Sequence, residues 1–234
     1  MATSGTTTWK LNRNELITAA LRKLAVLSGG SSPEEYQLTD GTQALNAMVK
    51  GFQTDGMPVW AIKTYTFTVS LSDPQYNIGV GQELNTAMPL KVVQAWRNSS
   101  SYSNVPLNIY TDYNYNLLPL ATSSGTPVNL YYQPLKDYGV INLWPKPNDS
   151  TTTITLRYQA PFEDMTGATD DLDFPSYWTE AVIYGLAVRL APEYGVPLQD
   201  RQLLQKEAEY FHQAALSFGT EEGGLFFQPD FTGR

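Results

Sequence analysis

The strongest constraint on the fold is a change in the spacing of apolar residues along the chain. At residues 64–71 apolar side chains alternate with threonine and serine, which is the pattern of a half-buried strand. A Leu-Trp-Pro-Lys-Pro run at residues 143–147 closes a further apolar strand, and Phe-Pro-Ser-Tyr-Trp at residues 174–178 opens a segment with helical spacing. The sequence therefore predicts a β-rich region that is followed by a helical one.

The helix predicted at residues 176–190 is apolar on nearly every side. Only Glu180 and Arg189 carry charge within it. A helix of this kind must be covered on nearly every side, and its small residues allow a neighbour to approach closely. We therefore expect a second copy of the chain to cover part of it. The expected subunit-interface residues are Ala181, Gly185, Leu186 and Val188.

Three more helices and a set of short strands complete the predicted fold, which is of the α+β class. The helices are expected at residues 12–27, 39–55 and 199–218. Asn12 and Glu15 form a capping-box pattern at the start of the first helix. The short strands, separated by turn signals, predict an antiparallel β-sandwich or barrel. We expect a four-helix bundle at residues 1–60 and 166–218, an inserted β-domain at 61–165, and an extended C-terminal tail at 219–234.

Composition excludes several classes of protein. Hydrophobic residues make up 42% of the 234 residues, which is enough for a sizeable core. The chain has no cysteine, which excludes disulfides, thiolate metal sites and a cysteine nucleophile. Residues 1–8 lack the basic and apolar regions of a signal peptide, and no apolar run reaches the roughly 18 residues of a membrane span. We therefore expect no membrane association.

The net charge of −8 is concentrated in the last third of the chain. Residues 166–234 carry four basic and eleven acidic side chains. Binding to the phosphates of nucleic acid needs clustered lysine and arginine. We therefore expect no sequence-specific binding of DNA or RNA.

Candidate catalytic and metal-binding residues are few. Acidic side chains are concentrated at residues 163–173. A glycosidase needs two carboxylates at a fixed separation, and calcium binding needs several oxygen ligands. The segment does not match the calcium-binding loop and is typical of a solvated linker near a helix N-terminus. His212 is the single histidine and no G-x-S-x-G nucleophile motif is present. We expect no catalytic residue, no metal and no cofactor, with a hydrolase at residues 163–173 as a minor alternative.

Two aromatic groups are candidates for binding other molecules. Tyr102, Tyr113 and Tyr115 are interleaved with asparagine and serine, a composition that suits protein- or sugar-binding loops. Ordinary strand and loop tyrosines are the alternative. At the C-terminus, Phe226, Phe227 and Phe231 follow two flexible glycines, which is typical of a docking segment. The alternative is that these aromatic residues pack on their own bundle.

Several short motifs occur in an order that resembles one family. They are Leu-Ile-x-x-Ala-Leu-Arg-Lys-Leu at residues 16–24, Gln-Thr-Asp-Gly at 53–56, Gly-Thr-Pro at 125–127, Leu-Trp-Pro-x-Pro at 143–147, Phe-Pro-x-x-Trp at 174–178 and Leu-Ala-x-x-Leu-Ala-x-x-Tyr-Gly at 186–195. Together they resemble the head-to-tail adaptor, or connector, proteins of short-tailed bacteriophages.

The resemblance implies a non-enzymatic structural protein of the virion. Members of the family form rings of twelve copies beneath the portal, extend the DNA channel toward the tail nozzle, and often offer attachment sites for tail fibres. The implied partners are the portal protein, the tail nozzle protein, tail fibres and further copies of the chain. Genomic DNA would pass through without sequence-specific binding, and assembly would take place in the bacterial cytoplasm.

The resemblance also implies roles for the two aromatic groups. By position in the chain, the portal-docking residues are Leu225, Phe226, Phe227 and Phe231. The expected contacts with tail or fibre proteins are Tyr102, Tyr113 and Tyr115. A carbohydrate- or receptor-binding β-module on a helical base remains the alternative function.

Overall fold

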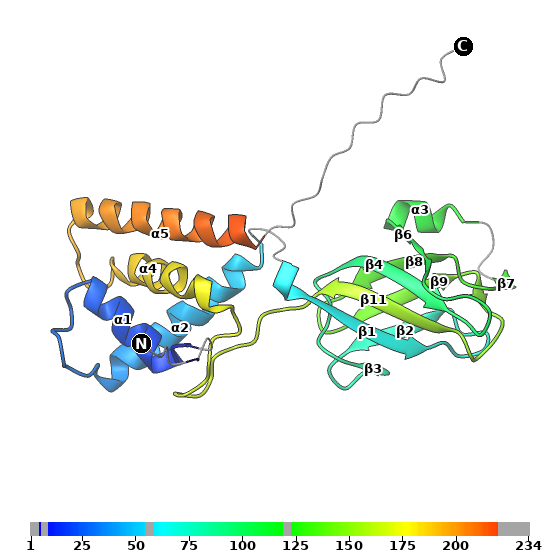
Figure 1. Ribbon diagram of the computed structural model, residues 1–234, viewed down its shortest axis with the longest axis horizontal. Helices are drawn as coiled ribbons and strands as arrows, with labels where there is room; N and C mark the ends of the chain where they lie inside the picture. Colours follow the sequence, from blue (N-terminus) through cyan, green and yellow to red (C-terminus); the bar gives the residue numbers. More distant parts are fainter. Residues whose placement is uncertain (1–4, 6–8, 55–58, 119–122, 220–234) are drawn as a thin grey trace, which may run out of the picture. The chain divides into compact units, whose positions relative to one another are not determined.

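The computed structural model describes residues 5, 9–54, 59–118 and 123–219 of the chain (Figure 1). It combines helices with several antiparallel sheets, so the predicted α+β class is confirmed. The chain divides into two compact units. The helical unit takes the described residues up to Met48 and from Met165 onward, and the β-unit takes Val49–Asp164.

The helical unit contains α1, α4, α5 and most of α2. The bounds are Arg13–Lys23 for α1, Glu35–Phe52 for α2, Thr179–Leu190 for α4 and Leu198–Phe218 for α5. The predicted capping box at the start of α1 is confirmed. The Glu15 amide donates to Asn12 Oδ1 at 2.9 Å, and the Asn12 amide donates to Glu15 Oε2 at 3.0 Å. The box satisfies two amides that the first turn of a helix leaves without partners.

Helix α4 forms the core of the helical unit. It packs against both α1 and α5, and seven of its twelve residues are buried. The Tyr184 ring on α4 stacks on Phe211 of α5 with 5.1 Å between ring centroids. A short 3-10 turn, Ser176–Trp178, precedes α4 and places Trp178 edge-on to His212 of α5. The nearly uniform apolar character of α4 is therefore explained largely by burial within a single chain.

Substitution of alanine for two glycines of α2, Gly41 and Gly51, should change the free energy of unfolding in opposite directions. A Cβ atom at Gly41 would lie 2.6 Å from Cγ2 of Ile17, which is fully buried on α1. A Cβ atom at Gly51 would meet no atom within 4 Å. Gly51→Ala should therefore raise the free energy of unfolding by up to about 1 kcal/mol, the helix-propensity gain. Gly41→Ala should lower it by about 1–3 kcal/mol because the α1–α2 contact becomes overpacked.

Chemical unfolding in urea measures both glycine variants against the unchanged chain. Each variant is the control for the other, because they place the same substitution in the same helix. Equal stability of Gly41→Ala and Gly51→Ala would contradict the close approach of α1 and α2.

The β-unit contains eleven strands and the short helix α3 (Asp112–Asn116) in its described part. One sheet has the strand order β1-β11-β4-β5 and a second has the order β3-β2-β9-β8-β6 (Figure 1). The small sheet β10-β7 is separate. The strand bounds are Ile62–Thr68 (β1), Gln75–Gly79 (β2), Leu84–Asn85 (β3), Lys91–Asn98 (β4), Val105–Pro106 (β5), Asn108–Tyr110 (β6), Ser124–Gly125 (β7), Asn129–Pro134 (β8), Gly139–Trp144 (β9), Lys146–Pro147 (β10) and Thr153–Gln159 (β11).

Side chains from the two large sheets share one hydrophobic core. Ile154 and Leu156 of β11 and Ile141 and Leu143 of β9 are each at most 1% exposed and belong to the same cluster. The alternation of residues 64–71 is the reason that one side of β1 faces this core, because successive strand residues point to opposite faces. The pairs β1–β11, β4–β11, β2–β9 and β8–β9 are antiparallel as predicted, whereas three short pairs, β2–β3, β6–β8 and β7–β10, are parallel.

The segment at residues 105–110 is divided between two sheets. Val105–Pro106 pairs with β4 as strand β5, whereas Asn108–Tyr110 pairs with β8 as strand β6. Leu107 lies at the crossing point, is 6% exposed and donates its amide to the Ala95 carbonyl at 2.9 Å. Apolar spacing does not reveal such a crossing, because both short strands have the same period.

Candidate functional site

The four predicted interface residues on α4 differ in their exposure. Ala181 is 1% exposed and Leu186 is 0% exposed within the single chain. Gly185 and Val188 are partly exposed. The cover that we expected from a neighbouring copy comes, for Ala181 and Leu186, from residues of the same chain. Contact with another subunit remains a prediction for α4, and Gly185 and Val188 are the positions with surface to offer.

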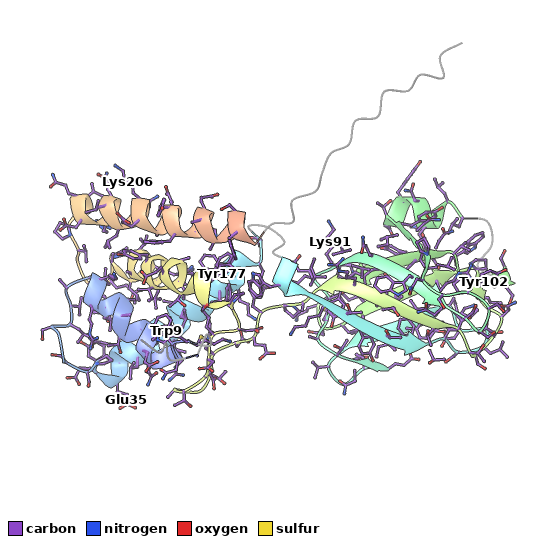
Figure 2. The ribbon with its side chains drawn as sticks, viewed as in Figure 1. Trp9, Glu35, Lys91, Tyr102, Tyr177 and Lys206 are labelled. Carbon is purple, nitrogen blue, oxygen red and sulfur yellow. The ribbon has the colours of Figure 1, made fainter. Side chains whose placement is uncertain are left out.

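The three predicted contact tyrosines lie on two elements of the β-unit. Tyr102, in the turn between β4 and β5, is 66% exposed (Figure 2). Tyr113 and Tyr115 belong to α3, and Tyr113 is 72% exposed. The Tyr115 ring is half-buried and packs on Tyr131 of β8 with 5.3 Å between centroids, and this burial raises the pKa of the Tyr115 phenol. Tyr102 and Tyr113 are thus available for contacts, whereas Tyr115 holds α3 on the sheet.

The predicted portal-docking residues, Leu225, Phe226, Phe227 and Phe231, lie outside the described residues. The last described helix, α5, ends at Phe218, whose ring packs edge-on against Tyr177 at 4.8 Å. The docking assignment therefore remains a prediction from the sequence.

The acidic segment at residues 163–173 has structural partners. Asp164 forms a salt bridge of 2.8 Å with Lys50. The Asp170 carboxylate accepts hydrogen bonds from the backbone amides of Thr166 and Gly167. The backbone carbonyl of Asp170 accepts a hydrogen bond from the Arg13 amide at 2.9 Å. Among the described residues, no three histidine or acidic side chains gather as metal ligands would. The segment is hydrogen-bonded to the start of α1, and its side chains Glu163, Asp164 and Asp171 are exposed, as in the solvated linker that we expected.

The pKa values of two loop carboxylates predict how stability depends on pH: Asp149, between β10 and β11, and Asp170, in the acidic segment. Hydrogen bonds from the Thr152 amide lower the pKa of Asp149, and those from the Gly167 amide lower the pKa of Asp170, below the ordinary 3.8. The native state then binds fewer protons than the unfolded state, so the stabilisation is present above that value. It should be lost as the pH falls from about 4 through the lowered pKa values.

The pH prediction can be checked with urea unfolding between pH 6 and pH 2, for which Asp149→Asn is the informative variant. The amide cannot titrate, but its oxygen can still accept from Thr151 and Thr152. We expect a flatter acid dependence in this variant than in the unchanged chain. Asp137→Asn, in an exposed turn, is the control and should leave the curve unchanged. An equally steep loss of stability in Asp149→Asn would refute the assignment.

His212 has a structural environment. It lies half-buried on the inner side of α5, with its ring 5.6 Å from that of Trp178. Catalytic triads need a histidine beside both a nucleophile and an acidic residue. The packing of His212 against a buried tryptophan accounts for its position without such a role.

A pocket at the edge of the β-unit is the feature that sequence reasoning missed. We call it the β4–β6 pocket, and its volume is about 610 Å³. Its polar and aromatic lining consists of Gln94, Trp96, Asn104 and Asn108. These residues come from β4, the β4–β5 turn and β6. The pocket depends on the crossing of the chain at Leu107, for which the sequence carries no periodic signal.

The outer side of α5 also exposes apolar residues that the sequence analysis did not select. Leu203 is 62% exposed and Tyr210 is 67% exposed. They are two helical turns apart and therefore lie on the same side of α5. The side of α5 that carries Phe211 packs against α4. Two exposed residues are too few to separate a second apolar stripe from chance spacing.

Comparison with known proteins identifies the family of the chain. None of the helices in the described part of the chain is long and apolar enough to cross a membrane. No curated protein matches the sequence. The sequence model of the SU10 adaptor protein family matches residues 11–222, a span that includes the described elements of both units from α1 to α5. The chain therefore belongs to the SU10 adaptor protein family, and its predicted kinship with phage head-to-tail adaptors is confirmed.

Proposed function

We propose that the chain is a structural head-to-tail adaptor of the virion, which forms a ring between the portal protein and the tail nozzle. The ring has twelve copies and extends the DNA channel. The observation that carries this proposal is the family match, which spans the helical unit and the β-unit together. The role requires no reaction, so we propose no catalytic residue, metal or cofactor.

The proposed domain organisation follows the strand-like and helix-like spacings of apolar residues in the sequence. Residues 1–60 and 166–218 form one four-helix bundle, residues 61–165 form an inserted antiparallel β-sandwich, and residues 219–234 form the docking tail. The packing of α4 against both α1 and α5 supports the bundle. The core shared by the two large sheets supports the sandwich, since facing sheets bury their inner side chains against each other.

The proposed contact between neighbouring copies uses exposed residues of α4 and α5. Gly185 and Val188 are the partly exposed positions of α4. Leu203 and Tyr210 are exposed apolar residues of α5 that we include in this proposal. Apolar side chains that remain exposed in a row are typical of interaction sites. The buried Ala181 and Leu186 would then hold α4 in position behind the interface.

The proposed partners use two different groups of residues. Leu225, Phe226, Phe227 and Phe231 dock on the portal protein, where aromatic side chains that fill pockets would supply most of the binding energy. Tyr102, Tyr113 and Tyr115 are the proposed contacts for the nozzle or tail fibres, and the exposure of Tyr102 and Tyr113 supports this. The adaptor is assembled in the host cytoplasm and remains at the head–tail interface of the virion.

The acidic balance of residues 166–234 supports the passage of DNA without binding. Among these residues, Asp200, Glu207 and Glu209 are exposed on α5. Like charges repel the phosphates of DNA, so an acidic surface in a channel would let the genome slide.

The proposed function is tested by deleting residues 223–234 and mixing the shortened chain with the portal protein. Electron microscopy and co-sedimentation should show that the full chain forms rings on the portal and that the shortened chain does not. The circular dichroism spectrum and urea midpoint should be unchanged, because the deletion removes none of the described elements. Full binding by the shortened chain would refute the tail assignment, and absence of any ring from the full chain would refute the function.

A further inference from the structure

We propose that the β4–β6 pocket is a binding site for neutral carbohydrate. The site does not depend on the ring or on the docking tail, so it goes beyond the proposed adaptor function. Its chemistry comes from one tryptophan and three side-chain amides, Trp96, Gln94, Asn104 and Asn108.

The pocket exists because strand β4 is longer than the strand beside it. Of the eight residues of β4, Trp96 and Arg97 pair with β5. The chain then crosses at Leu107 and continues as β6, at the edge of the other large sheet. In the described part of the chain, the first half of β4 has a strand partner on its β11 side and none on the other. The space between the diverging edges is the hollow of about 610 Å³.

The charge of the lining selects a neutral ligand. The described lining residues include no lysine, arginine, histidine, aspartate or glutamate. A phosphate, a carboxylate or an ammonium group in this pocket would lose water without meeting an opposite charge on the described lining residues, which is costly. A ligand that carries hydroxyl and amide groups loses its water at a lower cost, since the pocket amides can replace those hydrogen bonds.

The polar side chains of the pocket match the hydrogen bonding of a sugar. A side-chain amide both donates and accepts, and so does each hydroxyl group. Gln94 and Asn108 already have one partner each. Arg157 donates to Gln94 Oε1 at 3.4 Å, and Asn108 Nδ2 donates at 3.0 Å to Asn129, which is 4% exposed. Gln94 keeps its amide donor and Asn108 keeps its carbonyl acceptor for a ligand, with both groups already oriented.

Asn104 adds a third amide with a constrained backbone. Its amide donates to Asn98 Oδ1 at 2.6 Å, and its φ of 55° lies in the left-handed region. Among the described residues, its side chain has no hydrogen-bond partner. Asparagine adopts this conformation more readily than most residues, so the turn presents an amide at the rim of the pocket.

Trp96 supplies an apolar surface beside these amides. It lies on the side of β4 that faces away from the core, directly opposite Thr155 of β11, and it is partly exposed. Aromatic rings favour contact with flat apolar surfaces that also carry a polar edge. One face of a pyranose ring is a row of C–H groups with hydroxyl groups at its rim. A stacked ring with amides around it is therefore a sugar-binding arrangement.

The test uses the full chain and an array of neutral and anionic oligosaccharides, followed by titration calorimetry with the neutral sugar that binds best. Trp96→Ala should weaken binding about tenfold or more, through lost stacking. Because this residue is partly buried, Asn104→Gly is the second variant, and it should weaken binding at least about threefold. Glycine accepts the left-handed conformation of this position, so the fold is kept. Tyr36→Ala, an exposed aromatic residue on α2 outside the pocket lining, is the matched control and should bind as the unchanged chain does.

Several outcomes would overturn the site. Binding of no neutral sugar, or of anionic sugars alone, would do so. Undiminished binding by both Trp96→Ala and Asn104→Gly would place any sugar elsewhere. If these variants instead lost a tail-fibre protein while no sugar was bound, the pocket would belong to a protein partner. None of these results would affect ring formation on the portal, so the two proposals fail separately.

Discussion

Replacing Leu186 with alanine should lower the free energy of unfolding of the isolated chain by about 2–5 kcal/mol. Leu186 is 0% exposed on α4, the helix that both α1 and α5 cover. The substitution removes apolar contacts and leaves a cavity that the packed helices can fill only in part. Urea unfolding, followed by circular dichroism at a concentration where the chain is monomeric, measures the loss.

The control for this experiment is Val188→Ala on the same helix. Val188 is partly exposed, so its truncation should cost less than about 1 kcal/mol in the monomer. If Leu186→Ala instead left monomer stability unchanged and weakened ring assembly, Leu186 would belong to an interface between subunits and not to the core of one chain. The contrast between the two variants therefore separates the core positions of α4 from its surface.

Replacing Trp178 with alanine should cost about 3–5 kcal/mol of unfolding free energy. Trp178 is 1% exposed at the turn that leads into α4, and its ring meets Phe174 at 5.4 Å and His212 at 5.6 Å. The Trp178 side chain thus links the turn before α4 to α5. Its loss should expose both neighbouring rings and shift the thermal midpoint downward in calorimetry.

The neighbouring Tyr177 provides the matched control. It is 38% exposed and packs on Phe218 near the end of α5. Tyr177→Ala should therefore cost clearly less than Trp178→Ala, about 1 kcal/mol. Equal costs would mean that the ring of Trp178 does not anchor α4 to α5.

Local patterns predicted much of the fold because they act over a few residues. The alternation at residues 64–71 corresponds to β1, and the capping box of Asn12 and Glu15 begins α1. The predicted end of the first helix, at residue 27, was less accurate. Helix α1 ends at Lys23, and Ala25 takes a φ of 57°, which no helix continues. Helix α3 was missed because its five residues, rich in asparagine and tyrosine, carry no helical period.

The candidate sites were harder to predict than the fold. Tyr102 and Tyr113, chosen for their Asn/Ser-rich surroundings, are exposed, and their role as contact residues stays a prediction. The β4–β6 pocket escaped because Trp96 and Asn108 are separated in sequence by a turn and a change of sheet. No spacing rule brings such residues together, since a pocket is defined by chain paths and not by period.

The sequence by itself determined the order of the elements, the α+β class and the family, because periods, caps and motifs are local properties of the chain. Only the tertiary structure decided which surface covers each element. The apolar helix at residues 176–190 required cover on every side, and sequence could not say whether the cover belonged to the same chain or to a neighbour. Leu186 is buried within the single chain, on the helix that α1 and α5 cover, so the cover for the core of α4 belongs to the same chain. The physical reason is that burial depends on contacts between residues far apart in sequence, which no local pattern encodes.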